Sequence, residues 1–250
     1  MLFRSIAATY ADNWSYGKWS LLGVVVTHLQ NYSHLYVIGT LLGGTAVADV
    51  SASRLLLMPM ALLLAAWGKI VLPLGARMRQ ENRMRLFFRQ QGFIALALVV
   101  ATMLYAGGLA WIARPLAGIL FTDQYIKSLD FIMLWGAIFS CTFANMAASY
   151  GLQVLKKFKI ITQLNSITLA ITRSLLYLLA PGWQVRGALW AVLAGEAALA
   201  VALWFIFAAT VFNQEPSSLM QTWPMRRAQG SRGRLYRVLL RLQGVVGQRS

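Results

Sequence analysis

The sequence predicts an all-α integral membrane protein with six transmembrane helices. Hydrophobic residues make up 58% of the 250 residues, charged residues only 12%, and the mean hydropathy is +0.60. A soluble domain carries about 25% charged residues, so this chain cannot cover its surface with charge. A helix that crosses a bilayer needs about 20 mostly apolar residues, and the chain contains six such runs. Most of its surface is therefore expected to face lipid.

The six runs are expected to be helices because they lack the ten-residue alternation of membrane barrel strands. A helix also satisfies its own backbone hydrogen bonds, which lipid cannot do. In chain order, the predicted spans are Trp19–Leu42, Leu55–Leu74, Phe93–Ile112, Leu129–Leu152, Ile160–Ala180 and Gly187–Phe212.

Each run has its own character. The first is apolar at both ends but has the polar centre THLQNYSH, and the second is interrupted by Lys69 near one end. A lysine at that depth can extend its side chain to the membrane surface. The third run carries no charge, the fourth carries polar residues at helical spacing, and the short segment PGWQVR joins the last two as a hairpin.

The basic residues predict the orientation of these spans. Residues 1–18, the second and fourth connections and the tail carry 17 basic residues, whereas the alternate connections carry four. Basic loops stay in the cytoplasm, so residues 1–18 and the tail are both expected on the cytoplasmic side (N-in and C-in). The net charge of +16 then reflects topology and attraction to anionic membrane lipid rather than nucleic-acid binding.

The C-terminal segment 213–250 is predicted to be a basic cytoplasmic tail. Residues 213–233 have a linker composition. Beyond them, several Leu and Val residues share one helical face and the arginines lie away from it, which suits a helix lying in the inner membrane surface. A disordered basic tail is the alternative.

Polar residues within three spans predict a central hydrated cavity. On a helix, Thr27, His28, Gln30, Asn31 and His34 of the first span fall within about half the circumference, and such a face must meet other helices or water. The fourth span repeats the pattern with Thr142, Asn145, Ser149 and Gln153, and the fifth with Thr162, Asn165, Ser166 and Arg173. The alternative is that these groups only join helices, at about 0.6 kcal/mol each.

Two charged residues lie deep within the last two spans. Arg173 and Glu196 are expected at similar depth, because the short hairpin brings their helices together. An unpaired charge in hydrocarbon costs at least about 2.5 kcal/mol, so the two side chains are expected to form an ion pair. That pair would either hold the hairpin together or form a charged cavity site for an anionic substrate or a proton.

No enzyme signature or metal motif occurs in the sequence. It lacks the H-E-x-x-H metalloprotease motif and the G-x-x-x-x-G-K-[ST] phosphate loop, and His28 and His34 are not spaced as an i, i+4 metal pair. No catalytic residue, metal or cofactor is therefore expected, and the chain is not predicted to be an enzyme. A membrane acyl- or glycosyltransferase that uses His34 is the alternative. The histidines could also carry protons, since histidine titrates near neutral pH.

Several short motifs in a fixed order resemble the polysaccharide and O-antigen flippases of the multidrug/oligosaccharidyl-lipid/polysaccharide exporter superfamily. They are Gly17, Lys18 and Trp19 before the first span, the turn at Leu42 and Gly43, the small residues Ala46, Val47 and Ala48, and Arg54 opening the next helix. Pro59, VLPLGARM and FTDQY fit the same pattern, although Thr122 and Asp123 stand where such proteins often have Gly. The resemblance covers about residues 15–212.

The resemblance implies translocation of a lipid-linked oligosaccharide, usually carried on undecaprenyl pyrophosphate, across the bacterial inner membrane by alternating access. It implies that polar and cationic residues meet the anionic pyrophosphate. The expected cavity-lining residues are His28, Asn31, His34, Arg54, Asn145, Arg173 and Glu196.

Such flippases usually have twelve to fourteen spans in two lobes, whereas this chain has six runs and resembles the second, C-terminal lobe. It is therefore expected to be a fragment or split-gene product, or a half-transporter that pairs with a second six-span lobe or with itself. The alternatives are a drug or cation exporter of the same superfamily, an intramembrane enzyme acting on lipid-linked sugars, and a non-transporting assembly subunit.

Overall fold

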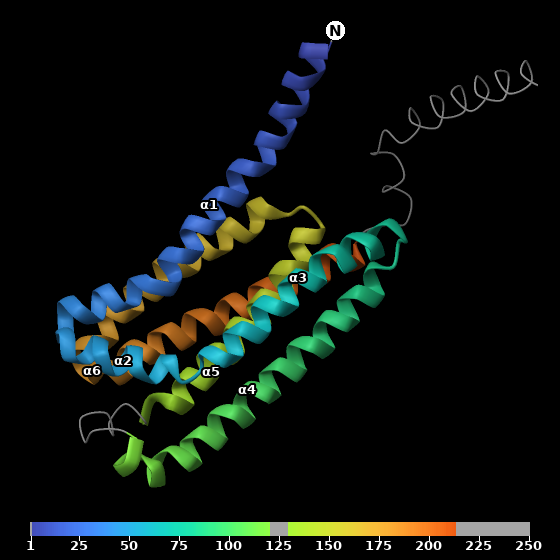
Figure 1. The fold of residues 1–250 in the computed structure, drawn as a ribbon. Coiled ribbons are helices and arrows are strands. Elements are labelled where there is room, and N and C mark those ends of the chain that lie inside the picture. Colours follow the sequence, from blue (N-terminus) through green and yellow to red (C-terminus); the bar gives the residue numbers. More distant parts are fainter. Residues whose placement is uncertain (1, 121–129, 214–250) are drawn as a thin grey trace, which may run out of the picture. The chain divides into compact units, whose positions relative to one another are not determined.

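The structure is a computed structural model that describes residues 2–120 and 130–213, and helices dominate this part of the chain. The helices are α1 (Leu2–Leu42), α2 (Gly44–Leu55), α3 (Met58–Gln80), α4 (Met84–Leu120), α5 (Ile132–Val154) and α6 (Phe158–Phe212) (Figure 1). Four of them are long and apolar enough to cross a membrane, namely α3, α4 over Met84–Ile112, α5 and α6. The chain is therefore all-helical and of membrane-embedded character. The expectations for residues 214–250 and for FTDQY lie outside the described residues.

The first predicted span lies within α1, which is not among those four helices. Its length is ample, but His28, Gln30, Asn31 and His34 interrupt its apolar character near the middle. A crossing by α1 therefore depends on what its polar centre contacts, because lipid cannot satisfy these groups.

The chain between the first two predicted spans is helical rather than a loop. It forms α2, and the break before it falls at Gly43, whose φ of 88° is a backbone conformation that suits glycine. The second predicted span was placed too early by three residues, since α3 begins at Met58. Pro59 explains this restart, because proline lacks an N–H and is tolerated in the first turn of a helix.

The last two predicted spans are the two halves of α6, which folds back on itself. The backbone leaves helical geometry at Gln184, within the segment PGWQVR (Figure 1). Gly187 allows the tight turn, because a Cβ there would lie 2.3 Å from the carbonyl oxygen of Leu179. Further along the pair, a Cβ on Gly195 would lie 1.9 Å from Oγ1 of Thr172, so the halves are in close contact. The predicted hairpin is confirmed.

α5 lies at the centre of the helical bundle. In its apolar span 61% of the residues are buried, against 17% for α4 and 22% for α3. It packs against both α4 and α6, whereas α1 packs mainly against α6. One core cluster surrounds Trp135, Phe139 and Phe143 of α5, and a second surrounds Phe87 of α4 and Phe207 of α6.

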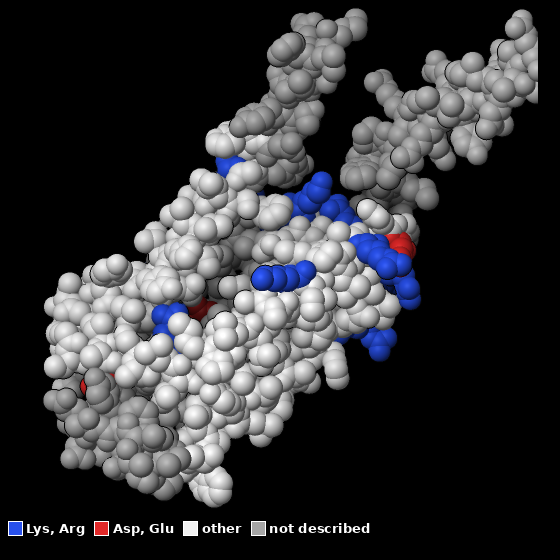
Figure 2. Space-filling view, viewed as in Figure 1, with Lys and Arg blue, Asp and Glu red and all other residues white. Residues whose placement is uncertain are grey.

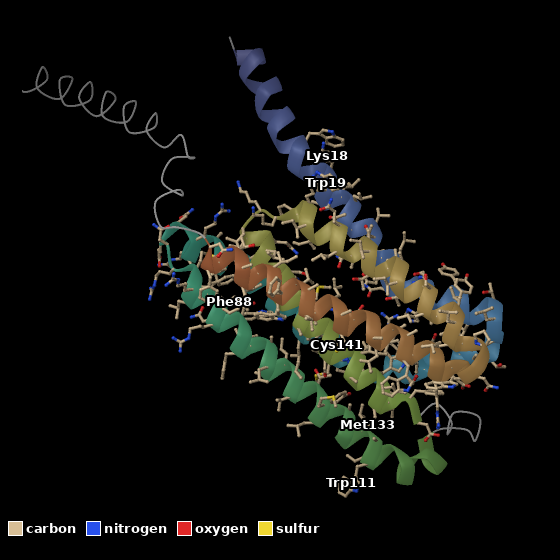
Figure 3. All side chains as sticks on the ribbon, turned by 180° about the vertical axis from the view of Figure 1, so that it is seen from behind. Lys18, Trp19, Phe88, Trp111, Met133 and Cys141 are labelled. Carbon is tan, nitrogen blue, oxygen red and sulfur yellow. The ribbon has the colours of Figure 1, made fainter. Side chains whose placement is uncertain are left out.

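Basic residues from separate parts of the sequence gather at one end of the bundle (Figure 2). The turn between α3 and α4 and the turn between α5 and α6 meet there, where Arg79 Nη1 donates to the Val154 carbonyl oxygen at 2.7 Å. Lys18 and Trp19 of α1 lie at the same end, beside the start of α6 (Figure 3), with Lys159 Nζ 5.5 Å from the centre of a Trp19 ring. The fold thus brings the strongly basic segments together at one end, although along the sequence they alternate with segments that carry few basic residues.

Candidate functional site

The polar centre of α1 contacts a buried carboxylate on the second half of α6. Glu196 is only 9% exposed, and its Oε1 accepts a hydrogen bond from Gln30 Nε2 of α1 at 2.9 Å. Its Oε2 accepts from Asn145 Nδ2 of α5 at 2.6 Å and from Thr142 Oγ1 at 3.3 Å. Asn145 Nδ2 also donates to the Glu196 backbone oxygen at 3.1 Å. One carboxylate therefore joins α1, α5 and α6.

The predicted ion pair between Arg173 and Glu196 is wrong. Arg173 Nη2 donates instead to the backbone oxygen of Leu29 on α1, at 3.3 Å. Both carboxylate oxygens of Glu196 are occupied by neutral donors, and no salt bridge involves Glu196 within the described parts of the chain. Hydrogen bonds from three neutral donors thus surround the carboxylate for which the sequence predicted a cationic partner.

Arg54, at the end of α2, contacts the same region of α1. Its Nη1 donates to the backbone oxygen of Asn31 at 3.2 Å, and its guanidinium carbon lies 5.5 Å from the ring centre of Tyr32 and 5.6 Å from that of Trp135. Cation–π contacts of this length stabilise a guanidinium without neutralising it. Arg54 and Arg173 therefore bond to carbonyls only two residues apart on α1.

His34 lies beside these two arginines and is almost fully buried. It is 3% exposed, its ring centre is 5.8 Å from that of Trp135, and both arginine charges act on it. Among the described residues, neither ring nitrogen forms a hydrogen bond of normal geometry, although the Gln30 backbone interacts with the ring, and Arg54 Nε and Arg173 Nη1 are buried without a partner. A buried polar group without a partner costs about 1–3 kcal/mol. We define His34, Arg54 and Arg173 as the cationic cluster.

The remaining predicted site residues are placed as follows. Asn145 is 5% exposed and belongs to the Glu196 contacts. Asn31 contributes its backbone oxygen to Arg54. His28 lies on the exposed side of α1, where its ring stacks on Tyr32 at 6.2 Å, apart from the cationic cluster. Helical geometry explains this, since residues four apart share a face.

Several residues at this site, among them Gln30, Thr142 and Trp135, were not in the predicted cavity-lining set. Gln30 was recognised as part of the polar face of α1, but its partner could not be identified from one helix alone. Trp135 could not be identified as a site residue from the sequence, because tryptophan is common in apolar runs that form a core. Its contacts with Arg54 and His34 arise only when α2, α1 and α5 pack together.

The surface of the described residues is hollowed beside α1 (Figure 2). Acidic atoms are visible at the floor of this hollow, and basic atoms lie at its edge. The polar contacts of α1 with other helices extend from the Trp19 carbonyl, which accepts from Thr162 Oγ1 at 2.9 Å, to the Asn31 carbonyl, which accepts from Arg54 Nη1. That separation is about 18 Å along a helix.

The described residues were compared with the requirements of a metal site. Among the described residues, no three His, Cys, Asp or Glu side chains lie close enough together to hold a metal ion. The available chemistry is the hydrogen-bonding and charge of guanidinium, imidazole, amide and carboxyl groups.

Comparison of the chain with protein-family models, with curated proteins and with solved structures finds no match.

Proposed function

We propose that this chain is the C-terminal lobe of a bacterial inner-membrane flippase that translocates a lipid-linked oligosaccharide by alternating access. The observation that carries the proposal is the cationic cluster. Two arginines and a histidine lie beside the polar centre of α1, and each arginine has a buried nitrogen without a hydrogen-bond partner among the described residues. The pyrophosphate of a lipid carrier has the charge and the oxygen acceptors that these groups lack.

The chemistry of the cluster favours a phosphate ligand. A guanidinium presents several N–H donors in a planar fork that fits phosphate oxygens, and charge-assisted hydrogen bonds of this kind are short and strong. Within the described residues, Arg54 and Arg173 each donate one hydrogen bond, to a backbone carbonyl of α1. The positive charge that both arginines exert on His34 would be offset by an anion bound beside its ring.

The position of the basic segments supports six spans with N-in and C-in topology. The α3–α4 and α5–α6 turns and Lys18 lie at one end of the bundle, which would be the cytoplasmic end under the positive-inside rule. The hairpin of α6 supplies two of the six crossings, and α1 supplies one if its polar centre faces the other helices and the hollow. The membrane is thus proposed as the first partner and the lipid-linked sugar as the second.

A second lobe is part of the proposal. The flippases that this sequence resembles have two lobes, related in that superfamily by a pseudo-two-fold axis along the membrane normal. A second six-span chain or a second copy of this chain would complete the transporter. Native mass measurement of the protein purified in mild detergent is expected to show one of these complexes, and a stable monomer would contradict the half-transporter.

One rival function has an observation in its favour. A drug or cation exporter needs an acidic site, and Glu196 is a buried carboxylate in contact with α1. Its oxygens already accept three hydrogen bonds, however, whereas Arg54 Nε and Arg173 Nη1 are buried without a partner among the described residues. The unsatisfied chemistry therefore favours an anionic ligand. An interfacial enzyme is disfavoured because the polar contacts follow α1 rather than collecting at one end.

Binding of a lipid pyrophosphate tests the proposal. Arg54→Gln is expected to weaken binding of a fluorescent undecaprenyl-pyrophosphate oligosaccharide to the purified protein about tenfold or more. A hydrogen bond to a charged group contributes about 1.5–3 kcal/mol, and 1.4 kcal/mol corresponds to a factor of ten. Lys69→Gln removes an exposed cation of α3 and is the matched control.

The comparison ligand is the same lipid without its pyrophosphate. Equal binding of that neutral lipid, or unchanged binding by Arg54→Gln, would contradict an anion site at the cluster. Loss of binding in both Arg54→Gln and Lys69→Gln would mean only a general attraction to positive charge, which also argues against the proposal.

A further inference from the structure

Glu196 is a buried carboxylate that has no cationic partner in the described structure. Ion pairs in the described structure include those of Arg77 and Arg83 with Glu81 and of Arg186 with Asp130, and these are exposed. The nearest arginine of the same hairpin, Arg173, bonds to Leu29 instead. A negative charge that is removed from water without a counter-charge is unfavourable. Hydrogen bonds from neutral amides and a hydroxyl compensate for it only in part.

The groups around Glu196 can accommodate a proton without a change in packing. Gln30 and Asn145 carry amides, each with donor N–H groups on one side and an acceptor oxygen on the other. In the structure both amides turn their nitrogen toward the carboxylate, while Asn145 Oδ1 is buried without a partner. Rotation of this amide by half a turn would place Oδ1 where a carboxylic O–H can donate to it. The site therefore holds an unused acceptor for a protonated carboxyl group.

The other titratable groups near this site are few. On α5, Cys141 lies about halfway along the helix (Figure 3) and is the group whose thiol feels the charge of Glu196. The cationic cluster supplies His34 from α1, Arg54 from α2 and Arg173 from the first half of α6, and the charges of both arginines act on His34. None of them forms a hydrogen bond with Glu196. A pH response of His34 must therefore be distinguished from one of Glu196.

Protonation of Glu196 would weaken its bond to α1. A charged carboxylate accepts shorter and stronger hydrogen bonds than a neutral acid does, and the bond to Gln30 is the side-chain contact by which Glu196 holds α1. Gln30 lies between Leu29 and Asn31, whose carbonyls accept from Arg173 and Arg54. Loosening α1 at this turn would therefore shift both arginines of the cationic cluster.

We propose that Glu196 is a proton-binding site that holds α1 against α5 and α6 when deprotonated and releases it when protonated. The proton adds to a carboxylate oxygen of Glu196, the carboxyl becomes neutral, and its O–H donates to Asn145 Oδ1. This inference goes beyond the proposed transport, because it concerns a proton and a helix contact and needs no lipid-linked substrate.

The first measurement is an infrared titration of the full chain in nanodiscs, from about pH 8 to about pH 5. Wild type is expected to gain the carbonyl band of a protonated carboxylic acid, and Glu196→Gln is expected to lose that component. His34→Phe should retain it. A band that persists in Glu196→Gln, or one that disappears in His34→Phe, would overturn the proposal.

The second measurement is a distance between α1 and α6. Spin labels are placed at Val24 and Val201, which are 56% and 72% exposed, in a Cys141→Ala background. The wild-type distance is expected to change with pH, whereas Glu196→Gln should keep the low-pH distance at every pH. A wild-type distance that ignores pH, or that responds to sodium at fixed pH, would overturn a proton-controlled contact.

Gln30→Leu keeps the experiment decisive if Glu196→Gln does not fold. This variant removes the bond to α1 but leaves the carboxyl group, so the infrared band should persist while the pH-dependent distance change is lost. Loss of the band in Gln30→Leu, or an unchanged distance response, would contradict the proposal. Neither readout involves substrate, so failure here is distinguishable from failure of the lipid-binding assay.

Discussion

A double-mutant cycle between Asn145→Ala and Glu196→Ala is expected to show a coupling free energy of about 1.5–3 kcal/mol for unfolding in detergent. Asn145 Nδ2 bonds to the Glu196 carboxylate at 2.6 Å, and both residues are buried. Removing either partner leaves the other without a charge-assisted hydrogen bond in a largely buried site. Removing both should therefore cost less than the sum of the single losses. The free energies would be measured by denaturant titration of each variant.

The matched cycle uses Arg173→Ala with Glu196→Ala. Because Arg173 bonds to the Leu29 carbonyl rather than to Glu196, its coupling to Glu196 is expected to stay below about 0.5 kcal/mol. A large coupling in this control, together with a small one between Asn145 and Glu196, would restore the ion pair that the sequence suggested. It would contradict the contacts described here.

Gly151→Ala is expected to destabilise the bundle by about 1–3 kcal/mol, as inserted methyl groups do in well-packed cores. A Cβ at this position of α5 would lie 2.3 Å from the Phe207 ring of α6. Phe207 is fully buried and contacts Phe87, Phe88 and Trp204, so it has no free space into which to move. The melting temperature in detergent is the measurement.

Gly107→Ala on α4 is the matched control, because a Cβ there meets no atom within 4 Å. Alanine favours a helix over glycine by about 1 kcal/mol, so this control should be neutral or slightly stabilising. If Gly151→Ala were equally neutral, the close contact between α5 and α6 at Phe207 would not exist in the folded protein.

Composition and local pattern were enough to predict the class of the protein. The low charge content predicts helices in a membrane, and the described chain is all-helical with four helices of spanning character. The segment PGWQVR, with its proline and glycines, predicts the reversal that the structure places at Gln184. These features are local, because each depends on a few neighbouring residues whose backbone preferences or hydropathy act in any context.

The same local reasoning failed where the position of a residue depends on contacts with other helices rather than on its neighbours along the chain. The segment before Arg54 was treated as a connection, with Arg54 opening the next span, yet it forms α2 and Arg54 lies in the last turn of α2, bonded to the Asn31 carbonyl of α1. His28 was grouped with the polar face of α1, but it shares a face with Tyr32. Placing the residues on a single ideal helix did not separate the side that carries His28 and Tyr32 from the polar face.

The sequence by itself determined that polar and charged groups lie within apolar helices, because their positions are simply read from the chain. Only the tertiary structure decided which of them meet. Glu196 is partnered by Gln30, Asn145 and Thr142 rather than by Arg173, and the two arginines converge on α1 instead. The physical reason is that hydrogen bonds and charge contacts act over a few ångströms. Partners are therefore set by how whole helices rotate and pack, which depends on contacts such as Gly195 with Thr172 that lie far apart along the chain.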